Sequence, residues 1–317
     1  MSAILDIQDV TVEYSTGGTI VRALDGASLA VQAGETVGLV GESGSGKSTL
    51  GSLIGRLLPG NARYPEGRVL VDGRDVLTLG VKELRALRRE QLGFIPQDPI
   101  SALDPTMRIG RQLELALQGL PNDRAALVGH LERVRMREPE RVLRLFPHEI
   151  SGGMAQRVVI AMTMARSPRI LVADEPTAAL DSNVRSEVTK LVFGLAREAG
   201  ATVLWLSHDL RSVGRWCERV AVMYAGRVVE DGPAEQVLGS PTHPYTRALA
   251  AADPAGVQPG ERIETSSVDV ASLAEAFRDE ERAAKRRAKG RKADAGTADD
   301  DADDPAEPAP EEEVMAR

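Results

Sequence analysis

A glycine-rich run, GLVGESGSGKSTL, gives the strongest chemical indication in the sequence. From Gly41 to Ser48 it has the spacing G-x-x-x-x-G-K-[ST], between an apolar strand-like segment and a helix-like one. Such glycines let backbone N–H groups line a concavity at a helix N-terminus, which favours phosphate. Lys47 would reach the β- and γ-phosphates, and the Ser48 hydroxyl would coordinate Mg²⁺. The pattern predicts a nucleotide site. The loop residues expected to contact it are Gly41, Glu42, Ser43, Gly44, Ser45, Gly46, Lys47, Ser48 and Thr49.

Two neighbouring carboxylates end the apolar segment of RILVADEPT. Asp174 and Glu175 would lie at the carboxyl edge of a buried strand, where α/β proteins bind their ligands. Asp174 would hold Mg²⁺, partly through water, and Glu175 would act as general base on the attacking water. Alone, such a pair is more often simply solvated. With the phosphate loop upstream, it predicts the second half of one site.

Three single residues also end strand-like segments, and the predicted nucleotide site suggests a role for each of them. The amide of Gln97 would contact Mg²⁺ and the attacking water, although a glutamine at a strand end is usually surface filler. The imidazole of His208 would contact the γ-phosphate, although a lone histidine is usually structural. The ring of Tyr14 would stack on adenine, with ordinary strand packing as the alternative.

A fourth stretch, ISGGMAQR, places Ser151, Gly152 and Gly153 where a helix is expected to start. Glycine in a helix costs about 1 kcal/mol relative to alanine, so two in succession need a reason. Either the stretch is a plain loop, or its backbone N–H groups must approach an anion. The stretch alone leaves both interpretations open.

The surrounding pattern predicts the elements that must position these residues. Strand-like segments fill residues 1–40, and short apolar segments then alternate with helical ones. Segments such as RILVAD are apolar throughout, as in strands buried on both faces of a parallel sheet. Residues 105–147 have only a helical pattern. We therefore predict an α/β fold with an N-terminal antiparallel β-subdomain, a parallel-sheet core and a helical subdomain inserted at about residues 100–166.

Composition excludes several classes of protein. The 317 residues are 42% hydrophobic but only 3% aromatic, so the core must be aliphatic. With Cys217 as the one cysteine, an intramolecular disulfide and a cysteine-ligated zinc or iron–sulfur site are excluded. No apolar run approaches the ~20 residues that span a bilayer, and the N-terminus lacks a basic leader. We expect a chain that is neither secreted nor integral to a membrane.

Charge is unevenly distributed along the chain. Residues 293–317 contain ten acids and one base, a net charge of −9 in a chain whose total is −8, which leaves +1 for the rest. Nothing in that balance requires a nucleic-acid partner. Residues 251–274 form an extension in which the alternation of strand-like and helix-like segments is lost. Residues 275–317 are expected to be a disordered, charged tail, either solvating or serving to dock a partner.

In order along the chain, these motifs resemble those of the ATPase subunits of ABC transporters. The phosphate loop, Gln97, SGGM, ADEPT, ALD and SHD cover about residues 4–250. The resemblance implies a P-loop NTPase (RecA-like) fold, an ATPase domain over residues 1–250, and ATP and Mg²⁺ as cofactors. The catalytic residues that it implies are Glu175, His208, Gln97 and Lys47, and the Mg²⁺ ligands are Ser48, Gln97 and Asp174.

The resemblance also explains the bare Ser-Gly-Gly. In ABC ATPases this tripeptide binds the γ-phosphate of ATP held by the other subunit of a head-to-tail dimer. Ser151, Gly152 and Gly153 would then act in trans, where a Cβ would block the partner's phosphate. The implied partners are a second ABC ATPase, with a heterodimer favoured over a homodimer, two integral-membrane permeases and, indirectly, an extracytoplasmic solute-binding protein. The chain would lie peripherally on the cytoplasmic face of the membrane.

Longer segments narrow the resemblance to the oligopeptide, dipeptide and nickel importers. They are FIPQDPISALDPTMRIGRQL, FPHEISGGMAQRVVIAM, VAVMYAGRVVEDGP and SPTHPYTRALAAADP. HPYTRAL is characteristic of that group, with a plain capped helix as the alternative interpretation. An importer, most simply of peptides, is therefore predicted, while an oligopeptide, a dipeptide, nickel or another solute stays open as its cargo.

The sequence departs from the family pattern at a few positions. Met154 stands where most ABC families have Gln, although this group commonly has Met, and Ala155 replaces a usual Arg. DSN follows Leu180 where DVT is commoner, and Ser207 stands where Thr is frequent. None of these changes removes a phosphate, metal or base ligand, so they put the fit to partners in doubt, not hydrolysis.

Two alternatives to a transport ATPase fit the sequence less well. A non-transport ABC ATPase acting on nucleic acid or the ribosome usually has two cassettes or a long coiled-coil insertion, whereas this chain has one cassette and a near-neutral body. A regulatory homologue that binds ATP without hydrolysis is disfavoured because Glu175 and His208 are both present.

Overall fold

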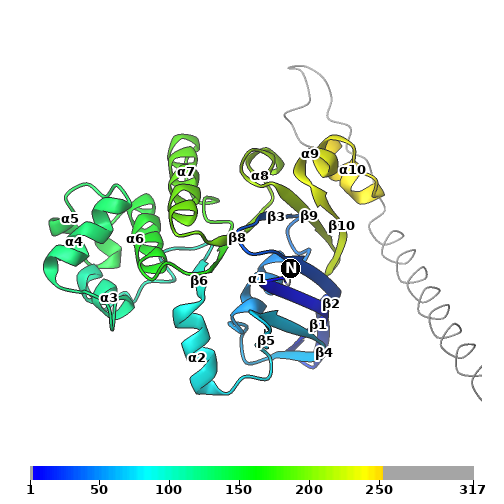
Figure 1. The fold of residues 1–317 in the computed structure, drawn as a ribbon, viewed down its shortest axis with the longest axis horizontal. Coiled ribbons are helices and arrows are strands. Elements are labelled where there is room, and N and C mark those ends of the chain that lie inside the picture. The colour runs from blue at the N-terminus through cyan, green and yellow to red at the C-terminus, as the bar shows by residue number, and fades with distance from the viewer. Residues whose placement is uncertain (1–2, 253–317) are drawn as a thin grey trace, which may run out of the picture. The chain divides into compact units, whose positions relative to one another are not determined.

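A six-stranded sheet forms the centre of the fold (Figure 1). The computed structural model describes residues 3–252, apart from the side chains of residues 182 and 183. The strand order is β10-β9-β3-β8-β7-β6, in which only β10 pairs antiparallel to its neighbour. The strands are β3 (Thr36–Val40), β6 (Leu92–Ile95), β7 (Ile170–Asp174), β8 (Thr202–Ser207), β9 (Arg219–Tyr224) and β10 (Arg227–Pro233). The α/β class with a parallel central sheet is confirmed.

Every residue of β7 and β8 is buried, as expected for strands covered on both faces. Because parallel strands end on the same side, the carboxyl ends of β3, β6, β7 and β8 meet at one edge of the sheet. That edge carries the phosphate loop after β3, Gln97 after β6, Asp174 and Glu175 at the end of β7, and His208 after β8. The topology therefore gathers residues that are far apart in the sequence.

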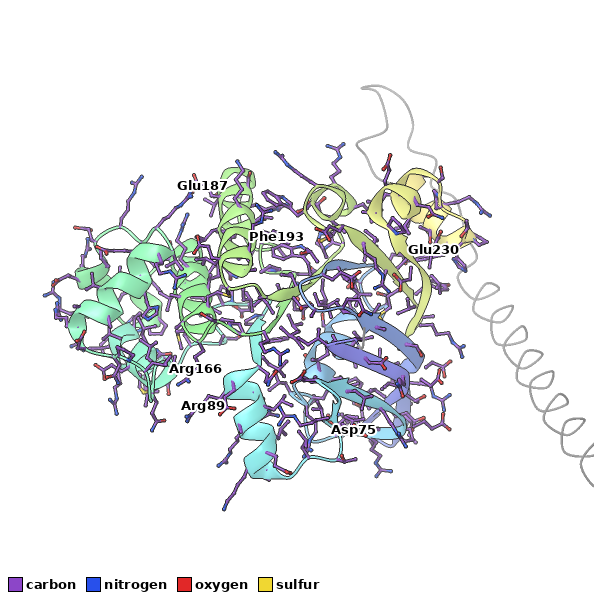
Figure 2. All side chains as sticks on the ribbon, viewed as in Figure 1. Asp75, Arg89, Arg166, Glu187, Phe193 and Glu230 are labelled. Atoms are coloured by element: carbon purple, nitrogen blue, oxygen red, sulfur yellow. The ribbon has the colours of Figure 1, made fainter. Side chains whose placement is uncertain are left out.

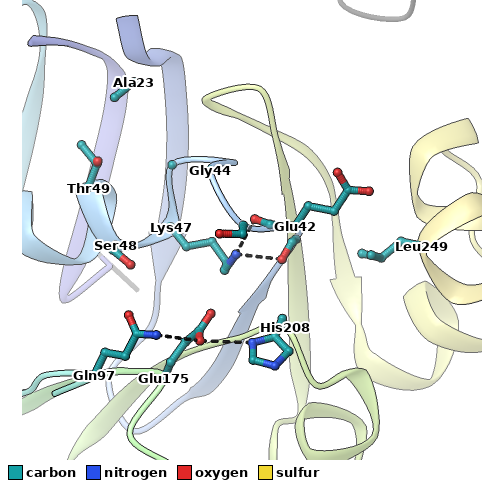
Figure 3. Close-up of a pocket in the computed structure, with 13 residues that line it drawn as sticks. Ala23, Glu42, Gly44, Lys47, Ser48, Thr49, Gln97, Glu175, His208 and Leu249 are labelled. Carbon is teal, nitrogen blue, oxygen red and sulfur yellow. Dashed lines mark hydrogen bonds and ion pairs between the residues drawn. The ribbon is translucent and has the colours of Figure 1, made fainter. Parts of the chain in front are cut away.

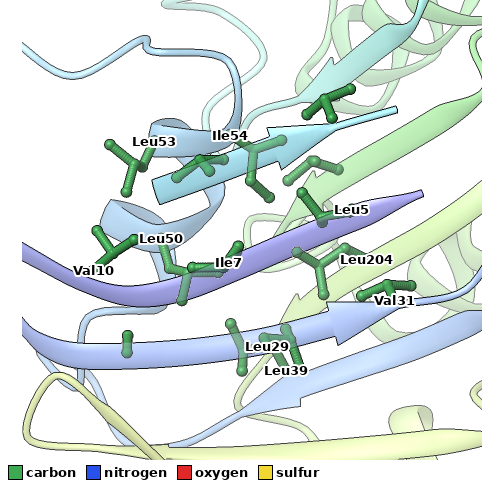
Figure 4. Packing of buried hydrophobic residues seen from close by; sticks show 14 of the residues in the cluster. Leu5, Ile7, Val10, Leu29, Val31, Leu39, Leu50, Leu53, Ile54 and Leu204 are labelled. Carbon is green, nitrogen blue, oxygen red and sulfur yellow. The ribbon is translucent and has the colours of Figure 1, made fainter. Parts of the chain in front are cut away.

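A second, antiparallel sheet is formed mainly by the N-terminal strands, in the order β2-β1-β4-β5. Its strands are β1 (Leu5–Thr16), β2 (Thr19–Val31), β4 (Ala62–Val71) and β5 (Arg74–Asp75). One aliphatic core joins both sheets to helix α1 (Lys47–Ile54), with Ile7, Leu39 and Leu53 each at most 1% exposed (Figure 4). The helix that begins at the phosphate loop is thus fixed by packing against both sheets.

Helices fill the chain between β6 and β7 (Figure 1). They are α3 (Ile109–Ala116), α4 (Arg124–Arg133), α5 (Pro139–Val142), a short 3-10 turn (Pro147–Glu149) and α6 (Gly152–Met164), while α2 (Val81–Glu90) precedes β6. No strand occurs among residues 96–169 of the described chain. Arg166, labelled in Figure 2, donates from Nε to the Ala116 carbonyl over 2.9 Å and so ties the end of α6 to α3.

Four further helices pack on the C-terminal strands: α7 (Ser182–Glu198), α8 (Leu210–Trp216), α9 (Ala234–Gly239) and α10 (Pro244–Ala251). Phe193 of α7, labelled in Figure 2, has its ring centroid 4.8 Å from that of Trp205 and 5.2 Å from that of Trp216. Within residues 3–252, no helix is long and apolar enough to cross a membrane. Of the extension expected at residues 251–274, the structure describes Ala251 and Ala252, at the end of α10, while the rest of it and the tail expected at residues 275–317 lie outside the described residues.

Candidate functional site

The loop from Gly41 to Gly46 turns sharply between β3 and α1. Gly41 has a φ of 154°, and a Cβ there would lie 2.2 Å from the Met223 carbonyl oxygen. Gly46 has a φ of 107°, and a Cβ there would lie 2.7 Å from the Ala23 carbonyl oxygen. Only glycine fits these two positions, because any side chain would meet backbone in a conformation that L-residues avoid.

Lys47, the first residue of α1, is only 5% exposed and folds back over the loop. Its Nζ donates to the Gly41 carbonyl over 2.7 Å and to the Glu42 carbonyl over 2.8 Å. Burial lowers the pKa of this ammonium, which the carboxylates of Glu175 and Asp174 partly counteract. A buried cation satisfied mainly by carbonyl oxygens suits an incoming phosphate, which would supply the missing negative charge.

Asp174 and Ser48 meet across the site, from the end of β7 and the first turn of α1. The Ser48 Oγ donates to the Asp174 Oδ1 over 3.0 Å. Burial raises the pKa of the Asp174 carboxyl, because few polar groups replace the water that it has lost. The pair offers adjoining hydroxyl and carboxylate oxygens, the ligand type that Mg²⁺ prefers.

Glu175 adopts a left-handed backbone conformation, with a φ of 42°. A non-glycine residue there costs about 1 kcal/mol, so the surrounding contacts must impose it. Its Oε2 accepts from the Gln97 Nε2 over 3.3 Å and lies 3.1 Å from the His208 Nδ1, as Figure 3 shows. The ends of β6, β7 and β8 thus converge on one carboxylate oxygen.

These groups line one cavity of about 720 Å³, a size typical of small-ligand sites. The phosphate loop forms one wall, and Gln97, Glu175 and His208 form the wall that faces it (Figure 3). The full lining is Ala23, Gly41, Glu42, Ser43, Gly44, Gly46, Lys47, Ser48, Thr49, Gln97, Glu175, His208 and Leu249. A phosphate chain on the loop would therefore face an amide, a carboxylate and an imidazole.

The structure does not bring every candidate residue into this cavity. Tyr14 is outside the lining: its ring packs against the core, and its Oη lies 3.3 Å from the Thr49 Oγ1. Ser45 belongs to the loop but is buried and does not line the cavity. Asp174 is also outside the lining and contacts the lining residue Ser48. Two lining residues were missed, Ala23 and Leu249. Leu249 belongs to the HPYTRAL segment, but nothing in that segment predicts that Leu249 lines the cavity.

The Ser-Gly-Gly stretch begins a helix, as expected, and its residues lie outside the lining of the cavity. The Ser151 Oγ accepts from the Met154 N–H over 3.3 Å and so caps α6. Among the side chains that the structure describes, a Cβ added at Gly152 would meet nothing within 4 Å, and one at Gly153 would meet the Val184 side chain at 3.5 Å. Packing against the described side chains therefore does not require either glycine.

Known proteins resemble the chain over most of its length. A family model described as ABC transporter matches residues 24–178. The peptidoglycan transport ATP-binding protein YejF of Agrobacterium fabrum is 43% identical over 263 residues, 81% of this chain and 48% of that protein. The chain thus spans about half the length of YejF. The oligopeptide transport ATP-binding protein OppD of Escherichia coli is 42% identical over 257 residues, 80% of this chain and 76% of that protein.

A solved structure matches the fold. The ATP-binding cassette MJ0796, determined as a dimer in a post-hydrolysis state with ADP and Pi, superposes with a TM-score of 0.65. The two proteins are 32% identical, and the match covers 73% of this chain and 98% of that one. Together with the phosphate loop and the wall that faces it, these similarities show that the chain belongs to the ABC transporter family, as one of its ATP-binding, ATP-hydrolysing subunits.

Proposed function

We propose that this chain hydrolyses ATP to drive the import of peptides through membrane permeases. The observation that carries the proposal is the wall of Gln97, Glu175 and His208 set opposite the phosphate loop in one cavity. The substrate class follows from relatives named for peptidoglycan and oligopeptide transport. The solute itself, whether oligopeptide, dipeptide or nickel, would be selected by the permeases and the binding protein.

Lys47 binds the β- and γ-phosphates in this proposal. Its Nζ already lies in the loop on the carbonyl oxygens of Gly41 and Glu42, so a small movement would exchange those oxygens for phosphate oxygens. Backbone N–H groups at the start of α1, such as those of Lys47 and Ser48, would donate to the same phosphates.

Mg²⁺ fits the oxygen ligands at the end of β7. Ser48 and Asp174 would hold it, together with the amide oxygen of Gln97. Burial raises the pKa of Asp174 although Lys47 counteracts it, so a bound divalent cation would further favour the ionised carboxylate. When bound, the metal supplies positive charge that polarises the phosphates.

Glu175 acts as general base towards the attacking water. Its carboxylate faces the cavity while Gln97 and His208 hold one of its oxygens, so its direction is fixed. The water would attack the γ-phosphorus in line with the bond to the bridging oxygen of the leaving ADP, and Glu175 would take the proton of that water. His208, which is exposed, would contact the γ-phosphate and orient it against that water.

The Ser-Gly-Gly stretch acts in trans on ATP held by a second cassette. Ser151, Gly152 and Gly153 lie at the N-terminus of a 13-residue helix, where backbone N–H groups attract anions. The open space around Gly152 supports this proposal, because a partner's phosphate would use it.

Within the proposed transporter, residues 1–250 form the cassette and residues 100–166 its helical subdomain. Two such cassettes, in a heterodimer with a sister ATPase or in a homodimer, would dock on two permeases at the cytoplasmic face of the membrane. An extracytoplasmic binding protein would deliver the solute to those permeases. The proposal includes no nucleic-acid partner.

The proposal is tested by measuring ATP hydrolysis of the purified chain with and without its co-expressed permeases and peptide. We expect the permeases and peptide to stimulate ATP hydrolysis.

Lys47→Ala should weaken MgATP binding at least tenfold, about 1.4 kcal/mol, because it removes the cation of the loop. Equal affinity would refute the phosphate-loop assignment. Stimulation by RNA or ribosomes instead of permeases would favour a non-transport ABC ATPase.

A further inference from the structure

Helix α10 contacts the phosphate loop through one hydroxyl group. The Oη of Tyr245 accepts a hydrogen bond from the Glu42 backbone N–H over 3.0 Å. We propose that Tyr245 is a positioning residue that holds the phosphate loop in its nucleotide-binding conformation. The inference rests on the nucleotide site proposed above. It assigns to the HPYT segment a role in ATP binding, in place of that of a plain capped helix.

The start of α10 is fixed by neighbouring side chains. His243 caps the helix, since its Nδ1 accepts from the Tyr245 N–H over 3.1 Å. Glu230 of β10, labelled in Figure 2, accepts from the Thr242 N–H over 2.7 Å and from the His243 N–H over 3.1 Å. Pro244 occupies the first helical position, where its missing N–H costs nothing. The HPYT segment thus presents Tyr245 at one defined place.

The ring of Tyr245 is anchored as firmly as its hydroxyl group. Tyr245 is 2% exposed, and its ring centroid lies 4.2 Å from that of Tyr224 at the end of β9. Two residues later, the Gly226 N–H donates to the Ser45 carbonyl over 2.9 Å, so the β9–β10 turn holds the same loop from another side. Burial raises the pKa of Tyr245 to about 12, so the hydroxyl stays protonated and neutral at physiological pH.

The peptide units around Glu42 are therefore held on both sides. Tyr245 binds the Glu42 N–H, and Lys47 Nζ binds the Glu42 carbonyl, over 2.8 Å. One turn further along α10, Leu249 lines the nucleotide cavity and faces the loop in Figure 3. When ATP draws Lys47 towards its phosphates, the Tyr245 bond remains to keep this part of the loop in place. Without that bond, the loop would spend part of its time in other conformations. The apparent affinity for nucleotide would fall in proportion to the fraction of molecules that keep the binding conformation.

Tyr245→Phe tests the hydroxyl alone, because it keeps the ring. Titration of the full chain with MgATP and with MgADP should show both nucleotides bound about threefold to tenfold more weakly, about 0.7–1.4 kcal/mol, the range of one intramolecular hydrogen bond. In steady-state hydrolysis KM should rise while kcat stays within about twofold, because Gln97, Glu175 and His208 are untouched. Hydrogen exchange at the Glu42 amide should accelerate in the nucleotide-free variant, because its acceptor is lost.

Tyr64→Phe is the matched control, since Tyr64 packs on the core from β4 outside the nucleotide cavity. It should bind MgATP like the wild type. Unchanged nucleotide affinity in Tyr245→Phe would overturn the inference, and so would a loss matched by the control or accompanied by unchanged exchange at Glu42. Failure of the wild type to bind MgATP, or full binding by Lys47→Ala, would instead refute the proposed nucleotide site. The two failures are therefore distinguishable.

Discussion

At the scale of single residues, the site depends on Glu175, whose strained backbone lies where three strands end. Its neighbour Asp174 is buried and binds Ser48, while Glu175 faces the cavity with Gln97 and His208. Two adjacent carboxylates thus have different surroundings, which suits one to a metal and the other to a proton.

Glu175→Gln should retain MgATP binding and lose turnover. The amide preserves the size of the side chain and one oxygen acceptor but cannot take a proton from water. Hydrolysis should fall about 10²–10⁴-fold, the range for a positioned general base. Single-turnover assays would measure this rate, and titration would confirm that ATP still binds. Wild-type hydrolysis by the variant would remove Glu175 from the mechanism.

Asp174→Asn should stabilise the nucleotide-free protein and abolish Mg²⁺-dependent hydrolysis. Burial raises the folded-state pKa of Asp174 above its unfolded value, so the ionised carboxylate opposes folding at neutral pH. Asparagine keeps an acceptor for Ser48 without the charge. We expect a higher melting temperature at pH 7.5, and a difference from the wild type that shrinks as pH falls through the range in which Asp174 becomes protonated. A lower melting temperature at pH 7.5 would contradict this account.

At the scale of elements, Arg219 on β9 joins both sheets. Its guanidinium donates to Asp231 of β10, to Glu35 just before β3 and, over 2.9 Å, to the Ala30 carbonyl of β2. The hydrogen bond to Asp231 and the charge of that carboxylate outweigh the effect of partial burial and raise the pKa of Arg219 above its usual value. The guanidinium therefore stays charged. Glu35 precedes β3 and Arg219 begins β9, so this cluster ties the two sheets together at the amino ends of these strands, opposite the edge that carries the phosphate loop.

Arg219→Met should lower the free energy of unfolding by about 1–3 kcal/mol, because it leaves partly buried carboxylates without their cation. The matched control is Arg111→Met, which breaks an exposed helical pair with Glu114. It should cost less than about 0.5 kcal/mol. Urea denaturation of both variants would measure the difference. Equal losses would show that the Arg219 cluster contributes no more than a surface pair.

At the scale of the whole molecule, each ATP is expected to lie between two cassettes. Glu175→Gln should accumulate as a dimer in MgATP, because it binds ATP without hydrolysing it. Ser151→Arg should stay monomeric, because the larger side chain blocks closure against the partner's phosphate. Size-exclusion chromatography would show this, with a sister ATPase added where the dimer requires one.

The control for Ser151→Arg is Ser151→Ala, since both lose the cap on the Met154 N–H, worth about 1 kcal/mol, and only arginine adds bulk. The alanine variant should retain more dimer than the arginine variant. Dimers of equal amount in both variants would place the Ser-Gly-Gly stretch away from the interface.

Deletion of residues 275–317 should leave folding and ATP hydrolysis nearly unchanged. This segment is rich in charge and poor in apolar side chains, so it offers little surface to offset the entropy of ordering. Thermal unfolding and ATPase assays of the truncated chain would test this. A fall of several degrees in melting temperature would show that the segment packs on the cassette.

Much of the site could be predicted because its information is local. The spacing from Gly41 to Ser48 encodes a loop between a strand and a helix, and the apolar run before Asp174 encodes a buried strand with its acids at the carboxyl end. The parallel order of the strands then places Gln97, Asp174 and His208 at one edge without further information. The sequence by itself therefore determined the family, the fold class and the residues opposite the phosphates.

Only the tertiary structure decided which other residues reach the cavity. Tyr245 binds the Glu42 N–H from 203 positions away, and no local pattern specifies a contact at that separation. Tyr14 lies against Thr49 and outside the lining, because the direction of a side chain at a strand end depends on its packing. Ala23 and Leu249 carry no chemical motif and enter the site only because β2 and α10 pass beside it. Motifs depend on local backbone geometry, whereas these positions depend on how distant elements pack.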